Sequence, residues 1–124
     1  MGAEQELEVS AVSDAVRAGL RLHPQLLEEL RAGLRQLYGE RLRGLYLYGS
    51  YARGEAGLDS DADILIVLDH VGRYGAEIDR SGKLISDLSL KYDVCLSRVI
   101  VTETRWKQDN TAFLENVREE AVAV

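Results

Sequence analysis

The sequence has 124 residues, of which 46% are hydrophobic and 29% charged, which is typical of a single folded domain and excludes a disordered chain. Acidic residues outnumber basic ones by 21 to 15, and the net charge of −6 argues against direct binding to nucleic acid. The single cysteine excludes an internal disulfide and favours a reducing, cytoplasmic location, and the longest apolar run, residues 64–68, is too short to cross a membrane.

The first third of the chain is predicted to be helical. Valines recur at helical spacing within residues 3–19, which predicts a short helix, and we assign residues 1–23 to an N-terminal extension of a domain that covers residues 24–124. Pro24 suits the first turn of a second helix. Leucine and tyrosine side chains then form one broad apolar stripe through residues 24–40, which predicts an amphipathic helix.

Two strands separated by a loop are predicted next. Residues 44–48 are aromatic and aliphatic and are followed by Gly49, a pattern that indicates a strand. Residues 61–68 form the second strand, whose last five residues are continuously apolar, as in strands covered on both faces. The intervening residues 50–60 contain glycines and charges, which predicts a loop with one helical turn.

The C-terminal third alternates between helix and strand. We expect a helix over residues 73–91, a strand over residues 92–97 that extends toward residue 101, a helical turn at residues 104–107 and a final helix over residues 111–120. The resulting order, α-α-β-β-α-β-α, predicts a mixed α/β (α+β) domain with a small sheet packed against helices.

Two acids on the second predicted strand are candidates for chemistry. Asp61 and Asp63 are two residues apart, so their side chains point the same way along a strand and their charges repel each other. A divalent cation between them removes this conflict, and Mg²⁺ is typically held by one or two carboxylates together with substrate phosphates. The alternative is a pair of solvated acids.

The end of the first predicted strand is a candidate phosphate-binding turn. Gly49 has no side chain, so a phosphate can approach its backbone, and N–H groups at the start of a helical turn attract anions. The Ser50 hydroxyl can donate to a phosphate oxygen. Arg53 can contact a phosphate as well, or it can pair with Glu55 or Asp59. An ordinary glycine turn is the alternative for this segment.

Asp93 is a candidate third acid. It lies near the start of the third predicted strand, where a buried carboxylate needs a partner such as a metal or the proton of a nucleophile. Two metal ions could share Asp61, Asp63 and Asp93, one activating an attacking hydroxyl and the other neutralising phosphates. This arrangement indicates phosphoryl or nucleotidyl transfer, although an acid that simply faces water at a strand start is the alternative for Asp93.

The spacing of these residues resembles a known signature. Residues 49–63 contain Gly-Ser, ten further residues and then Asp-x-Asp, with Ala-Arg-Gly at residues 52–54, and this pattern resembles that of minimal nucleotidyltransferases of the DNA polymerase β-like superfamily. The length and the segment at residues 113–117 resemble the MntA-type antitoxin branch, which pairs with HEPN-domain RNase toxins. The resemblance covers roughly residues 25–120.

This resemblance implies a polymerase β-like fold and an adenylyltransferase that acts as the antitoxin of a type VII-like pair. AMP would pass from the co-substrate ATP to a tyrosine of a HEPN-domain RNase toxin, with Mg²⁺ as cofactor. The chain would form a hetero-oligomer with that toxin, without contacting nucleic acid or a membrane directly.

The resemblance also implies roles for the candidate residues. Asp61, Asp63 and Asp93 would be catalytic and would hold Mg²⁺, with Asp93 activating the acceptor hydroxyl. Gly49 and Ser50 would bind the β- and γ-phosphates of ATP. We add Arg53 to these nucleotide-binding residues.

Two other functions stay open at this point. The chain could mask a toxin stoichiometrically without chemistry, or it could modify a small molecule, as aminoglycoside nucleotidyltransferases do. The presence of all three acids favours an enzyme, and the short chain leaves little room for additional substrate-binding helices. The acceptor is therefore expected to be presented by another macromolecule.

Overall fold

The computed structural model describes residues 21–124, so the helix expected at residues 3–19 lies outside the described residues. In chain order the elements are α2 (Pro24–Tyr38), the 3-10 helix η1 (Gly39–Arg41), β1 (Leu42–Tyr48), α3 (Ser50–Arg53), β2 (Ala62–Leu68), α4 (Tyr74–Tyr92), β3 (Leu96–Thr102), α5 (Glu103–Gln108), α6 (Ala112–Glu120) and β4 (Val122–Ala123). The predicted mixed α/β class is confirmed.

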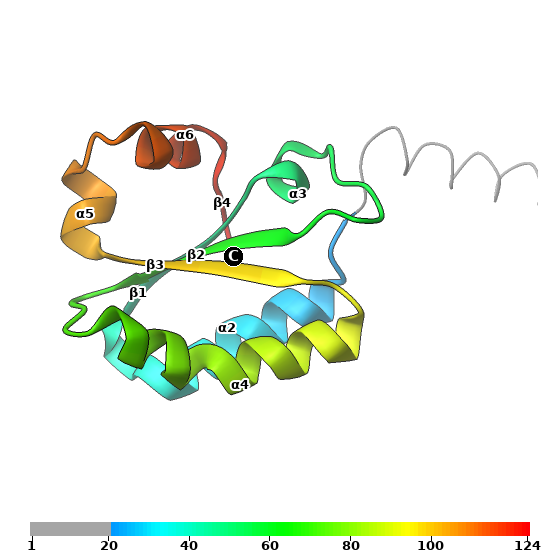
Figure 1. Cartoon of the computed structure of the whole chain (residues 1–124), viewed down its shortest axis with the longest axis horizontal. Coiled ribbons are helices and arrows are strands. Elements are labelled where there is room, and N and C mark those ends of the chain that lie inside the picture. The colour runs from blue at the N-terminus through cyan, green and yellow to red at the C-terminus, as the bar shows by residue number, and fades with distance from the viewer. Residues whose placement is uncertain (1–20) are drawn as a thin grey trace, which may run out of the picture.

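The four strands form one mixed sheet in the order β3-β2-β1-β4. β1 pairs antiparallel with both β2 and β4, whereas β2 and β3 run parallel and are connected through α4. Helices α2 and α4 lie together against one face of the sheet, and α3, α5 and α6 lie on the other side (Figure 1). The predicted small sheet flanked by helices is therefore present.

Helix α2 follows the predicted pattern. Pro24 occupies the first helical turn, and the Nδ1 atom of His23 accepts a hydrogen bond from the Gln25 amide at 3.1 Å, which caps the helix. Leu26, Leu30, Leu34 and Tyr38 of this stripe are buried, whereas Leu27 is half-buried and Leu37, also part of the stripe, is 40% exposed. The chain leaves the helix at Gly39, which has a φ of 55°.

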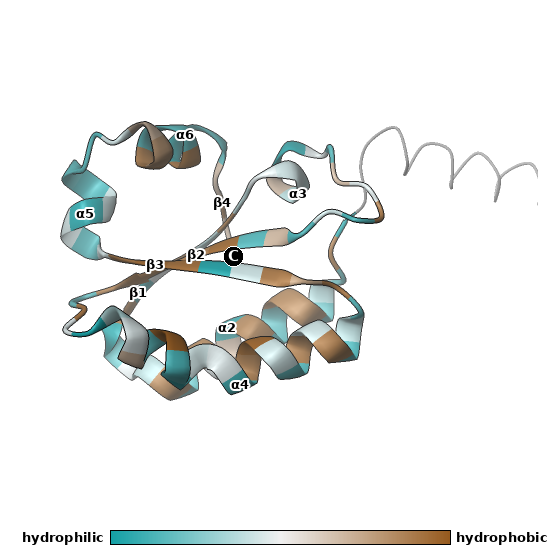
Figure 2. Cartoon of the chain, viewed as in Figure 1, coloured by the Kyte–Doolittle hydropathy of each residue, from teal (hydrophilic) through white to brown (hydrophobic). Residues whose placement is uncertain are grey.

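Strand β2 lies in the centre of the sheet and is covered on both faces, as its continuous apolar run predicted. Residues 64–68 are all at most 1% exposed. Ile64 and Ile66 pack in the cluster that includes α2 and α4, whereas Leu65 and Val67 pack with the α6 residues Leu114 and Val117. Figure 2 shows the same distribution, with hydrophobic colour concentrated on the strands and alternating with hydrophilic colour along α2 and α4.

The predicted start of the third strand was wrong. Helix α4 continues through Tyr92, Asp93 caps it in a left-handed conformation with a φ of 51°, and β3 begins only at Leu96. The last turn of α4 is held against α2, because the Tyr92 hydroxyl donates to Glu29 at 2.6 Å and Lys91 pairs with the same carboxylate. This contact between helices overrides the alternating pattern that favoured a strand.

The short strand β4 was not predicted. It consists of two residues, which is too short to show a period, and it pairs Ala123 with Tyr46 and Val122 with Leu47. The strand forms because the edge of β1 is available to it, a condition that local sequence does not reveal.

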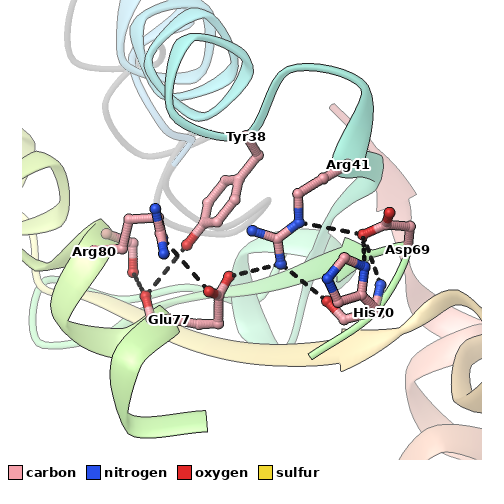
Figure 3. A network of polar contacts seen from close by, with 7 residues as sticks. Tyr38, Arg41, Asp69, His70, Glu77 and Arg80 are labelled. Carbon is pink, nitrogen blue, oxygen red and sulfur yellow. Dashed lines mark hydrogen bonds and ion pairs between the residues drawn. The ribbon is translucent and has the colours of Figure 1, made fainter. Parts of the chain in front are cut away.

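A polar network closes the end of the sheet at which β2 ends (Figure 3). Glu77 of α4 is 4% exposed, and its carboxylate lies 3.3 Å from Arg41 Nη2 and 3.5 Å from Arg80 Nε. Arg41 also donates to Asp69, the residue after β2, at 3.3 Å, and the Tyr38 hydroxyl donates to the Glu77 carbonyl at 3.2 Å. The network thus ties the α2–β1 connection to the β2–α4 connection.

Arg41→Ala is expected to lower the free energy of unfolding by about 2 kcal/mol, because it removes a charged donor from a buried carboxylate. Urea denaturation measures this loss as a lower midpoint with an unchanged slope. Arg43→Ala is the matched control, because Arg43 is exposed. Equal midpoints for the two variants would show that the network does not contribute to stability.

Candidate active site

A tight turn connects β1 to α3, and we call residues 49–53 the glycine turn. Gly49 has a φ of 75° and a ψ of −155°, a combination that is essentially restricted to glycine. A Cβ atom at this position would lie 2.2 Å from the Asp63 Oδ2 atom. The turn therefore requires glycine both for its backbone conformation and for the close approach of the Asp63 carboxylate.

The strand pairing brings the glycine turn and the candidate acids together. Tyr48, the residue before the turn, pairs with Asp63 across the antiparallel β1–β2 ladder. Ala62 and Ile64 are buried in the core, whereas Asp63 is half-buried and Asp61 is exposed. Asp63 therefore lies beside the glycine turn, and Asp61 immediately precedes β2.

The charge of Asp63 is unfavourable in this position. Burial raises the pKa of the Asp63 carboxyl, the neighbouring charges of Asp61 and Glu120 raise it further, and Arg53 opposes them. A bound divalent cation would stabilise the charged form instead. Mg²⁺ is typically held by one or two carboxylates together with substrate phosphates, so the donor set of Asp61 and Asp63 fits that ion.

Glu120 was not predicted from the sequence, yet it contacts the glycine turn. This last residue of α6 accepts a hydrogen bond from the Gly49 amide at 2.9 Å through Oε1, and its Oε2 atom lies 2.9 Å from Arg53 Nη1. Both contacts lower the pKa of the Glu120 carboxyl, the Arg53 hydrogen bond having the larger effect. In sequence, Glu120 looks like one acid among several on a solvated helix, and no local pattern distinguishes it.

Arg53 forms ion pairs with two carboxylates, those of Glu55 and Glu120. Its Nε atom lies 3.0 Å from Glu55, one of the two partners considered from the sequence, and its Nη1 atom contacts Glu120. The side chain is 43% exposed, so the guanidinium stays accessible at the surface of the glycine turn. Arg53 can therefore meet a phosphate as well as these carboxylates.

The third candidate acid, Asp93, is not part of a metal-binding cluster in this structure. It is exposed at the C-terminal cap of α4, three residues before Leu96, which pairs with Ala62 across the parallel β2–β3 ladder. Residues 21–124 contain no group of three His, Cys, Asp or Glu side chains placed to hold a metal ion. Asp93 thus precedes β3 at the same end of the parallel strand pair at which Asp61 precedes β2, and its catalytic role stays a prediction.

The nucleotidyltransferase domain family matches residues 27–123, which is most of the chain and includes every candidate residue. The chain belongs to this family. Two similar proteins of Methanocaldococcus jannaschii are named protein adenylyltransferases, MJ0604 and MJ0141. MJ0604 is 36% identical over 76% of this chain and 89% of its own length, and MJ0141 is 30% identical over 81% and 96%. The protein is thus a nucleotidyltransferase, as the motif at residues 49–63 predicted.

Solved structures share the fold. One, titled a toxin–antitoxin with AMP-PNP, has a TM-score of 0.56 and 23% identity over 77% of this chain and 70% of that chain. A mutant of the MntA–HpeT toxin–antitoxin has a TM-score of 0.54 and 21% identity over 78% and 70%. At these identities the likenesses show that the nucleotidyltransferase shares the fold of these two proteins, in agreement with the expected fold class.

In the part of the chain from residue 21 onward, no helix of the nucleotidyltransferase is both long and apolar enough to cross a bilayer.

Proposed function

We propose that this nucleotidyltransferase transfers AMP from ATP to a tyrosine of a HEPN-domain RNase toxin and thereby acts as its antitoxin in a cytoplasmic, type VII-like pair. The observation that supports the proposal is the close approach of the Asp63 carboxylate to Gly49, because a phosphate bound at the glycine turn would then lie beside Asp63, with Asp61 two residues earlier in the chain. A nucleotide whose phosphates lie on the turn would then share a cation with the acids.

Each candidate residue has one proposed role in nucleotide binding, metal binding or proton transfer. The Gly49 amide, the Ser50 hydroxyl and Arg53 bind the β- and γ-phosphates, and Asp61 and Asp63 hold Mg²⁺, which when bound neutralises phosphate charge. The tyrosine oxygen then forms a bond to the α-phosphorus while the bond to pyrophosphate breaks. Asp93, exposed before the start of β3 at the end of the sheet where Asp61 precedes β2, is proposed to accept the tyrosine proton.

A protein acceptor is supported by the relatives and by the size of the domain. The similar proteins are named protein adenylyltransferases, and both solved structures are titled as toxin–antitoxin assemblies, one with AMP-PNP. Four strands and their covering helices occupy nearly all of residues 21–124, which leaves no separate substrate-binding unit in that part of the chain. A hetero-oligomer with the toxin would supply the acceptor.

Intact-mass spectrometry tests this function. Incubation of the toxin with the nucleotidyltransferase, ATP and Mg²⁺ is expected to add mass equal to one or more AMP groups, located on tyrosine by peptide sequencing. Replacement of ATP by α,β-methylene ATP, whose α–β bridge cannot be cleaved, is expected to add nothing. An unmodified toxin whose RNase activity is nevertheless blocked would favour stoichiometric masking, and modification of an aminoglycoside in its place would favour the small-molecule function.

A further inference from the structure

Glu120 occupies the groups that the proposed function assigns to phosphate. Its two carboxylate oxygens divide between the Gly49 amide and the Arg53 guanidinium, each at 2.9 Å. The Glu120 side chain is 23% exposed, so it covers the turn without being enclosed. A carboxylate that bridges a backbone N–H and an arginine makes the contacts that a phosphate would make at the same place.

Glu120 and a nucleotide phosphate cannot use the glycine turn in the same way at the same time. The Gly49 amide has a single hydrogen, which Glu120 already accepts. A phosphate oxygen placed on that hydrogen would also lie within a few ångströms of the Glu120 charge, and like charges at that distance repel. The Asp63 carboxylate, which the charges of Asp61 and Glu120 both affect, adds further negative charge nearby.

We propose that Glu120 is a displaceable occupant of the glycine turn, which holds the turn in the nucleotide-free protein, competes with the ATP phosphates and is released when they bind. This inference rests on the proposed use of Gly49, Ser50 and Arg53 for phosphate binding. It assigns to Glu120 control of nucleotide affinity and no part in the transfer step itself.

The position of Glu120 allows this movement. It is the last residue of α6, and the next element, β4, has only two residues and an exposed Val122. The packing of α6 depends on Leu114 and Val117, which lie about two turns and one turn before Glu120 and are 0% and 2% exposed. The Glu120 side chain can therefore leave the glycine turn while α6 keeps its hydrophobic contacts.

The competing possibility is that Glu120 is a permanent brace that orients Arg53 for the phosphates. A brace and a competitor predict opposite effects on affinity, because loss of a brace weakens nucleotide binding whereas loss of a competitor strengthens it.

Calorimetric titration with Mg²⁺ and α,β-methylene ATP distinguishes a Glu120 that competes with phosphate from a Glu120 that braces Arg53. Glu120→Gln and Glu120→Ala are expected to bind about fivefold or more tightly than the unsubstituted protein, because one competing charge has been removed. Glu119→Gln is the matched control, since Glu119 is an exposed acid one residue earlier, and it should leave the affinity unchanged. Equal or weaker binding by both Glu120 variants would overturn this inference alone, whereas no binding by any of the proteins would overturn the proposed function with it.

NMR spectroscopy can follow the displacement of Glu120 directly in the unsubstituted protein. The carboxyl ¹³C resonance of Glu120, assigned by its absence from the spectrum of Glu120→Gln, is expected to move toward that of exposed Glu119 when the unsubstituted protein is saturated with Mg²⁺ and α,β-methylene ATP. A Glu120 resonance that stays in place while resonances of the glycine turn shift would show that the carboxylate remains on the turn, and would overturn the proposal.

Discussion

Asp63→Asn is expected to lower AMP transfer at least about a hundredfold, because it replaces a carboxylate proposed to hold Mg²⁺ with a neutral amide of the same shape. The same substitution is expected to raise the melting temperature at neutral pH. Burial and the nearby charge of Asp61 raise the pKa of the Asp63 carboxyl, so its ionised form is unfavourable in the folded, metal-free protein. The ionised Asp63 carboxylate therefore lowers the stability of the folded, metal-free protein, although the proposed metal site requires it.

The sign of this effect can be checked by varying pH. Because the Asp63 pKa is higher in the folded protein than the usual 3.8, the folded state binds the proton more tightly. This contribution to stability is full below pH 3.8 and is lost as pH rises through the raised folded value. Melting temperatures of the unsubstituted protein and Asp63→Asn should therefore converge at low pH and separate as pH rises.

Two further substitutions complete this test. Asp61→Asn should also abolish transfer, with a gain in stability of its own because one repulsive charge near Asp63 is removed. Asp59→Asn is the control, since Asp59 is exposed in the preceding loop and should affect neither property. Near-normal transfer by Asp61→Asn or Asp63→Asn with Mg²⁺ and ATP would show that the metal-binding residues are wrongly assigned.

Gly49→Ala is expected to abolish nucleotide binding and to destabilise the protein by more than the roughly 1–3 kcal/mol that backbone strain alone costs. Its backbone has a φ of 75°, and the added methyl group would lie 2.2 Å from the Asp63 carboxylate. Either the glycine turn or Asp63 must move, and both are needed in the proposed site. Thermal unfolding and titration with Mg²⁺ and α,β-methylene ATP measure the two effects.

Substitutions at two other glycines distinguish the cost of backbone strain at Gly49 from the cost of the collision with Asp63. Gly39 also has a positive φ, 55°, but no atom lies within 4 Å of its Cβ position, so Gly39→Ala reports the cost of backbone strain. Gly57 has open space and no such φ, so Gly57→Ala should be almost neutral. If Gly49→Ala were no less stable than Gly39→Ala and still bound nucleotide, the close approach to Asp63 would be irrelevant to the site.

The central strands, the amphipathic helix α2 and the motif at residues 49–63 could all be predicted from the amino-acid sequence. Each of these depends on neighbours in the chain: an apolar run, a helical spacing, or a glycine before a helical turn. Asp61 and Asp63 leave the core side by side because side chains alternate along a strand, and this rule needs no knowledge of the rest of the fold. The nucleotidyltransferase class could therefore be predicted from the motif at residues 49–63.

The start of β3, the existence of β4 and the identity of the carboxylate on the glycine turn depend on contacts between distant parts of the chain, and the sequence did not predict them. Contacts with α2 extend α4 to Tyr92 and leave Asp93 as its cap, although the local pattern favoured a strand. Glu120 is 71 residues from Gly49 in the chain and reaches it because the end of α6 returns to the edge of β1. Such pairings depend on how distant segments pack, and neither helical period nor strand alternation contains that information.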